Sequence, residues 1–230
     1  MKHLCALLLL FSLSLTAQVA VDTTTLDNVE VTTLKQSKKI TIGNGTRKKA
    51  ALSPFTTDWS MLGKLFPYKE SYTATPFLKN VELFTRNKSN ATAQFRLHLY
   101  KMGKDSLPAE ELVAGGIMAS AKRGKKETVV DVTAYNLSMP AEGLIVAYEW
   151  LKFDSNLYPY EATGKIVDTE IVIAKKTERV LVHGPDIYSN DMPQPISYYF
   201  KGYWHKFQMN QWSRHNGNWM VPAINVTLSN

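Results

Sequence analysis

The sequence predicts an all-β protein folded as a two-sheet antiparallel β-sandwich with a jelly-roll-like arrangement of strands. Apolar and polar residues alternate with a period of two along much of the chain, which is typical of strands with one buried face. No window of about fifteen residues carries the i, i+3, i+4, i+7 apolar stripe of an amphipathic helix. Turn-forming stretches separate the alternating segments at the short intervals expected of a sandwich.

The clearest strand is Ala93–Lys101. Its odd-numbered residues are apolar up to Leu99, whereas Gln94, Arg96 and His98 alternate with them, so we expect one dry and one wet face. Phe77–Thr85 alternates in the same way. The residues between the two strands, 86–90, are rich in turn formers, so the pair is predicted to form a hairpin.

Further strands are expected along the rest of the chain, with turns such as 103–108, 138–143 and 184–186 between them. Ten short strands without helices favour two packed sheets of galactose-binding-like type over an open sheet. The sandwich domain is placed at 54–230. The segment 18–53 precedes it and is expected to be partly ordered, with one or two short strands at Asn28–Leu34 and Lys39–Gly43. The further strands are Glu111–Ala119, Glu127–Val132, Gly143–Lys152, Val167–Ala174, Arg179–His183, Ile196–Phe200, Trp204–Trp212 and Pro222–Leu228.

The composition is that of a globular protein, with 44% hydrophobic and 20% charged residues among 230. This excludes a disordered, collagenous or coiled-coil chain. The net charge of +7 is divided among small clusters, including Lys122–Lys126 and Lys175–Arg179, which we interpret as solvated loops. Nucleic-acid binding is not predicted, because it would require one continuous basic stripe with stacking aromatics. The only cysteine, Cys5, excludes a disulfide framework and a Cys-ligated metal site.

Residues 1–17 have the organisation of a secretory signal peptide. Lys2 begins a short polar start, Leu4–Leu15 is almost entirely apolar, and Ala17 ends a stretch of small residues where cleavage is expected. The apolar run is shorter than the ~20 residues of a membrane span, so no transmembrane span is expected in the mature chain. Export without cysteines favours a bacterial protein of the periplasm, the outer membrane or the extracellular space.

Six phrases occur in a characteristic order over residues 26–152. In this order they resemble exported Gram-negative bacterial proteins described as carboxypeptidase-like regulatory domain-containing, and in particular the β-sandwich that follows their regulatory domain. The resemblance implies a cell-envelope-associated β-protein and implies no reaction; the complete regulatory domain is not expected in the residues before Pro54. The phrases are LDNVEV (Leu26–Val31), ITIGN (Ile40–Asn44), FLKNVEL (Phe77–Leu83), FRLHLY (Phe95–Tyr100), VDVTAYNL (Val130–Leu137) and GLIVAYEW (Gly143–Trp150).

The usual catalytic signatures are absent from the sequence: there is no Gly-x-Ser-x-Gly elbow, His-Glu-x-x-His pair, phosphate loop or dinucleotide fingerprint. No catalytic residue, metal site or cofactor is therefore predicted. Histidines such as His98 could meet Glu149 or Asp131 around Zn²⁺, but nothing in their spacing requires it. Glu149 lies among apolar neighbours and is either a general acid or, as we favour, the partner of Arg96 on an adjacent strand.

The carboxyl-terminal third is rich in aromatic residues, interleaved with amides and Arg214. Exposed aromatic rings can stack on the apolar faces of sugars while neighbouring polar groups bind hydroxyls. The alternative is that these rings fill the sandwich core. The candidate ligand-binding residues are Tyr203, Trp204, Gln208, Asn210 and Arg214.

Three functions remain open at this point. The first is a non-catalytic envelope protein that binds a glycan or another envelope component. The second is a structural or interaction module with no small-molecule ligand, which docks through its amino-terminal segment to an outer-membrane transporter or another envelope protein. The third, least favoured, is a hydrolase that uses two carboxylates facing one cleft.

Overall fold

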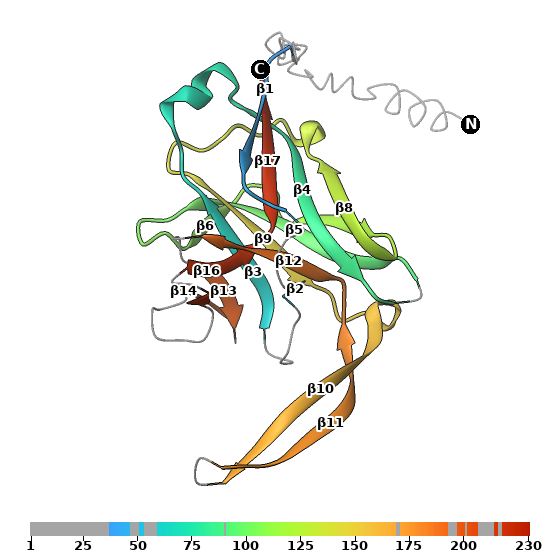
Figure 1. The fold of residues 1–230 in the computed structure, drawn as a ribbon. Coiled ribbons are helices and arrows are strands. Elements are labelled where there is room, and N and C mark those ends of the chain that lie inside the picture. Colours follow the sequence, from blue (N-terminus) through green and yellow to red (C-terminus); the bar gives the residue numbers. More distant parts are fainter. Residues whose placement is uncertain are drawn as a thin grey trace, which may run out of the picture. The chain divides into compact units, whose positions relative to one another are not determined.

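Two antiparallel sheets face each other across a shared apolar core (Figure 1). A computed structural model describes residues 37–46, 51–52, 59–89, 91–168, 171–192, 197–200, 202–206, 214–215 and 218–230. All of them belong to one compact unit, Leu34–Asn230. The prediction of an all-β sandwich is confirmed, since the described helical elements are short 3₁₀ turns: η1 (Glu70–Ala74), η2 (Thr133–Tyr135) and η3 (Asp154–Asn156).

The eight-stranded sheet contains both ends of the described chain. Its strand order is β1 (Lys39–Gly43), β17 (Ile224–Ser229), β4 (Phe77–Asn87), β12 (Asp186–Met192), β16 (Asn218–Pro222) and β15 (Arg214–His215). Two more strands lie off this path: β8 (Gly124–Asp131) pairs with β4, and β2 (Ala51–Leu52) pairs with β12. The predicted strand Lys39–Gly43 is therefore an edge strand of the sandwich. The predicted strand Asn28–Leu34 lies outside the described residues.

The seven-stranded sheet packs against the first. Its order is β14 (Tyr203–Lys206), β13 (Ser197–Phe200), β3 (Trp59–Phe66), β9 (Leu144–Trp150), β5 (Ala93–Met102) and β6 (Pro108–Glu111), and β7 (Ile117–Ala121) also pairs with β5. Two long strands, β10 (Leu157–Asp168) and β11 (Ile171–His183), pair with each other and form a separate hairpin beside the sandwich (Figure 1).

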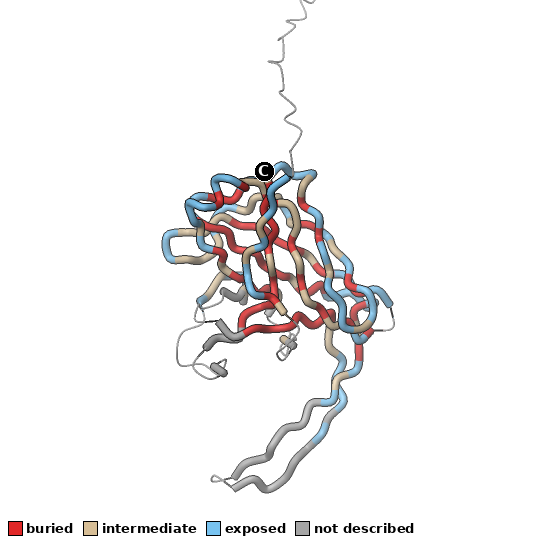
Figure 2. The backbone as a smooth tube through the Cα atoms, turned by 45° about the horizontal axis from the view of Figure 1, so that its top comes forward, coloured by how far each residue is buried: buried red, intermediate tan, exposed pale blue. Residues whose placement is uncertain are grey.

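The core forms where the alternating apolar faces of the two sheets meet. Phe95, Leu97 and Leu99 of β5 are fully buried, as are Val81 and Leu83 of β4 in the opposite sheet. Figure 2 shows this buried layer along the middle of the sandwich, with exposed residues at the loops. The apolar face predicted for β5 is confirmed, because its side chains alternate as the pleat requires.

The hairpin predicted between Phe77–Thr85 and Ala93–Lys101 is wrong. β4 belongs to the eight-stranded sheet and β5 to the other, so the chain crosses between sheets at 88–92. The crossing is held by buried Asn87, whose amide donates to the carbonyls of Ala91 at 2.8 Å and Ala121 at 3.0 Å. Its side-chain oxygen accepts from Ser89, which closes a local turn.

Two other predicted strands are each divided between two strands of the structure. Glu111–Ala119 divides into β6 and β7, because Gly115 and Gly116 adopt positive φ angles of 74° and 70° between them. Val167–Ala174 is divided between β10, which ends at Asp168, and β11, which begins at Ile171. The alternation did not predict β3, β10 or β12. The hairpin prediction also missed the strands that pair with β4, which are β17, β12 and β8.

Within the described part of the chain, no helix has the length and apolar character needed to cross a membrane.

Candidate functional site

The outer face of the seven-stranded sheet carries a group of polar and aromatic side chains. Because Phe95, Leu97 and Leu99 turn toward the core, the intervening residues of β5 lie on the opposite face. The register of β5 with β9 pairs Arg96 with Glu149 and Tyr100 with Ile145. We call this group the outer-face cluster: Arg96, His98, Tyr100, Glu111, Glu149, Tyr199 and Trp204.

Two carboxylates enclose His98 within this cluster. Nε2 of His98 lies 2.9 Å from Oε2 of Glu149, and Nδ1 lies 2.5 Å from Oε1 of Glu111. Burial lowers the pKa of His98, but the hydrogen bonds and charges of Glu149 and Glu111 outweigh burial and raise it above the ordinary 6.5. The ring is therefore expected to be an imidazolium that joins two strands.

Arg96 completes the charged part of the cluster. Its Nη1 donates to Oε2 of Glu149 at 3.2 Å, which confirms the predicted pairing of these two residues. The expectation of a wet face is wrong at His98, which is 6% exposed because Glu111 and Glu149 cover it. Among the residues that the structure describes, no group of three or more His, Cys, Asp or Glu is arranged to hold a metal ion.

Aromatic rings continue the cluster toward the sheet edge. The rings of His98 and Tyr100 stack with centroids 5.8 Å apart, and Trp204 meets Tyr100 edge-on at 5.6 Å. Tyr199 contacts Trp204 edge-on at 5.4 Å. Burial, followed by the charges of Glu111 and Glu149, raises the pKa of Tyr100 above its ordinary value. Trp204 is half-buried, so part of its ring remains available to a ligand.

The structure places only one of the predicted ligand-binding residues in the outer-face cluster. Trp204 belongs to the outer-face cluster. Tyr203 precedes it in β14, so its side chain points to the other side of the strand, and it is 73% exposed. Arg214 belongs to β15 in the other sheet. Gln208 and Asn210 lie outside the described residues. The sequence did not indicate the contribution of Glu111, whose carboxylate reaches His98 from β6.

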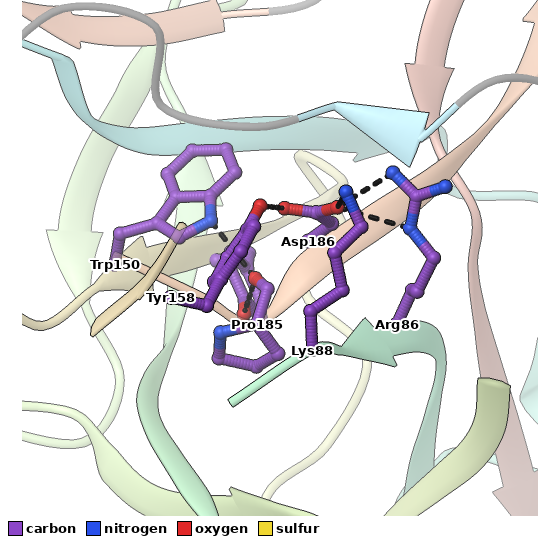
Figure 3. A network of polar contacts seen from close by, with 7 residues as sticks. Arg86, Lys88, Trp150, Tyr158, Pro185 and Asp186 are labelled. Atoms are coloured by element: carbon purple, nitrogen blue, oxygen red, sulfur yellow. Dashed lines mark hydrogen bonds and ion pairs between the residues drawn. The ribbon is translucent and has the colours of Figure 1, made fainter. Parts of the chain in front are cut away.

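A second polar network surrounds Asp186, the first residue of β12 (Figure 3). Asp186 is fully buried, and its Oδ2 accepts from Nε and Nη2 of Arg86 at 3.0 and 2.7 Å. The hydroxyl of Tyr158 donates to Oδ1. The ammonium of Lys88 lies 3.7 Å from Oδ2. These contacts fasten the base of the β10–β11 hairpin to the eight-stranded sheet.

The preceding residue joins the two sheets at the same place. The carbonyl of Pro185 accepts hydrogen bonds from the Tyr148 hydroxyl at 2.7 Å and from Trp150 Nε1 at 3.0 Å (Figure 3). Tyr148 is fully buried, and burial raises its pKa well above the ordinary value. The donors come from β9, so the start of β12 is anchored to both sheets.

A pocket of about 450 Å³ opens beside this network. It is lined by Lys88, Pro159, Tyr160, Glu161 and Arg179. The prediction that Lys175–Arg179 is a solvated loop is wrong, because these residues belong to strand β11. The polar residues 175–179 do not alternate with apolar ones, so the sequence contains no strand signal there, and only the hairpin register places Arg179 opposite Glu161.

Comparison with protein-family models, with curated proteins and with solved structures found no match for this chain. The resemblance to carboxypeptidase-like regulatory domain-containing proteins therefore stays a prediction.

Proposed function

We propose that this chain is an exported, non-catalytic β-sandwich protein of the bacterial cell envelope that binds a glycan on its outer-face cluster. The observation that supports the proposal is the half-buried Trp204, packed on Tyr100 and Tyr199 on the same sheet as Arg96 and Glu149. Such a surface offers an aromatic ring for the apolar face of a sugar and charged groups for its hydroxyls.

Arg96 has donors to offer to hydroxyl groups. It uses Nη1 to bind Glu149 and is 35% exposed at the side chain. Because a guanidinium carries five N–H donors, the remaining donors can bind a ligand while the ion pair stays intact. The carboxylates of Glu149 and Glu111 are hydrogen-bonded to His98, which favours a positioning role for them over acid–base chemistry.

Binding of soluble polysaccharides tests this proposal. Tryptophan fluorescence of the wild type should shift on titration with the recognised polysaccharide. Trp204→Phe, which keeps an apolar ring against Tyr100, should weaken binding about fivefold to tenfold in a calorimetric titration, which does not depend on the replaced tryptophan, a change of ~1–1.4 kcal/mol. Arg96→Gln should weaken it by a similar factor. Circular dichroism confirms that each variant is folded.

Tyr203→Ala is the matched control, because Tyr203 is exposed on the neighbouring position of the same strand. Loss of binding in Tyr203→Ala with normal binding in Trp204→Phe would assign the ligand to the other side of β14. The absence of any shift across the panel would contradict glycan binding altogether.

A second candidate function, docking to another envelope protein, is favoured by the β10–β11 hairpin. Leu181 is 68% exposed and Val180 is 39% exposed on β11, so the base of this hairpin presents apolar side chains to solvent. Isolated exposed apolar residues are common, but Val180 and Leu181 point to opposite faces of β11, so each face of the projecting hairpin offers an apolar side chain to a protein partner. Leu181→Lys should abolish such a contact and leave polysaccharide binding unchanged in the same titration.

A further inference from the structure

The pocket at the base of the β10–β11 hairpin is lined by Lys88, whose nearest carboxylate, Asp186, is already neutralised by Arg86. Asp186 is fully buried, and its carboxylate already accepts two hydrogen bonds from Arg86 and one from Tyr158. Both Arg86 hydrogen bonds go to Oδ2, and the guanidinium balances the single negative charge. Lys88 therefore adds positive charge beyond what Asp186 requires.

The Lys88 ammonium is held in place but keeps its hydrogen-bonding capacity. Its Nζ lies 5.0 Å from the ring centroids of both Tyr158 and Tyr160. It lies 3.7 Å from Oδ2 of Asp186, which exceeds hydrogen-bonding distance; Figure 3 shows Lys88 beside Tyr158 and Asp186. Among the described residues the Lys88 ammonium donates no hydrogen bond, and the side chain is 33% exposed. An ammonium has three donors, so those that do not face Asp186 or the two rings can serve a ligand in the pocket.

Arg179 supplies a second cation to the same pocket. It lies opposite Glu161 in the hairpin register, and both line the pocket with Lys88. In the described part of the chain the side chains of Arg179 and Glu161 form no hydrogen bond or ion pair. With Arg86 and Asp186 balancing each other, two cations and one carboxylate leave the pocket with a net positive charge.

We propose that this pocket binds a small hydrophilic anion, a carboxylate or phosphate group on a sugar-sized ligand, through Lys88 and Arg179. The volume of about 450 Å³ falls within the range of small-ligand sites. Four of the five lining residues carry polar or charged groups, which favours a hydrophilic ligand over an apolar one. The site is separate from the outer-face cluster, so it goes beyond the glycan-binding function proposed above.

Calorimetric titration of the folded protein distinguishes the ligand classes. The probes are trigalacturonate for a carboxylate, glucose 6-phosphate for a phosphate, and galactotriose as the uncharged counterpart. At low salt we expect at least one anionic probe to bind and galactotriose not to bind. Raising the salt concentration should weaken that binding, because part of the pocket is open to solvent.

Three variants test the assignment. Arg179→Gln and Lys88→Gln should each weaken binding of the anionic probe at least tenfold. Lys104→Gln removes an equal charge from the exposed turn between β5 and β6 and should change nothing. Because Lys88 also contacts two tyrosine rings, its replacement could destabilise the protein, and thermal unfolding checks that the Lys88→Gln variant is folded. Arg179 is exposed, so Arg179→Gln tests the pocket without this effect on stability.

The proposal is overturned if neither anionic probe binds at millimolar concentration, if galactotriose binds as tightly as the anions, or if Arg179→Gln binds like the wild type. Trp204→Phe should leave anion binding unchanged. Failure of the outer-face glycan site and failure of this pocket are therefore separate results.

Discussion

Lys64 lies in the sandwich core, and its burial predicts an unusual dependence of stability on pH. It stands between Leu62 and Phe66 on β3 and is 2% exposed. Its Nζ donates to the carbonyl of Ile224 in the opposite sheet at 2.7 Å and lies 5.2 Å from the Phe66 ring. Burial lowers the pKa of Lys64 from 10.5 to about 8 in the folded protein.

The difference in pKa between the two states sets the direction and the size of the effect. Below pH 8 both states carry the ammonium, and the folded state bears the full cost of burying it. Between pH 8 and 10.5 the unfolded state holds more protons, so stability rises with pH. At ~1.36 kcal/mol per pH unit, the change totals about 3 kcal/mol, of which about 2 kcal/mol falls between pH 7 and 10.

Urea unfolding of the wild type and Lys64→Met at pH 7 and pH 10 measures this change. The free energy of unfolding of the wild type should rise by about 2 kcal/mol relative to the variant, since methionine does not titrate. Other titrating groups are common to both proteins and cancel. Lys104→Met, which removes an exposed lysine, should follow the wild type. An unchanged difference between wild type and Lys64→Met at the two pH values would refute the burial of a charged Lys64.

The remaining predictions concern the outer-face cluster. His98→Gln should cost about 1–3 kcal/mol at pH 6, where His98 is charged in both states. Because the folded-state pKa of His98 is raised, this loss of stability should diminish as pH rises through that pKa. Urea unfolding of the wild type and the variant at pH 6 and pH 9 measures the change. The same loss at both pH values would contradict the presence of the imidazolium. Gly116→Ala places a Cβ 2.9 Å from side-chain atoms of Arg96 and His98 at a φ of 70°, so thermal unfolding should show a loss of about 2–3 kcal/mol. Gly115→Ala meets no atom within 4 Å at a φ of 74° and should cost about 1 kcal/mol, and equal losses would contradict the contact.

The pairing of strands shows where sequence reasoning stops. Alternation predicted β4 and β5 individually, but their neighbours in the chain are not their partners in the sheets. β4 pairs with β17 through contacts such as Val81 with Val226, which are far apart in sequence. The turn formers at 86–90 predict a hairpin, but β4 and β5 lie in different sheets, so turn-forming residues do not by themselves show which strands pair.

The candidate sites also show which contacts between residues the sequence predicts and which it does not. The Arg96–Glu149 pair was predicted because both residues lie on the polar positions of adjacent strands. The burial of His98 was not, since its cover comes from Glu111 in β6 and from Glu149 in β9. The pocket around Lys88 was not predicted either, because Arg179 reaches it from a strand 91 positions later in the sequence.

By itself the sequence determined the all-β class and the faces of its most regular strands, because those properties depend on neighbours two residues apart. The tertiary structure alone decided which strands pair, that Lys64 is enclosed in the core, and that Lys88 and Arg179 share a pocket. These features depend on segments that are distant in the chain, and the local pattern of residues contains no information about which distant segment will lie beside them.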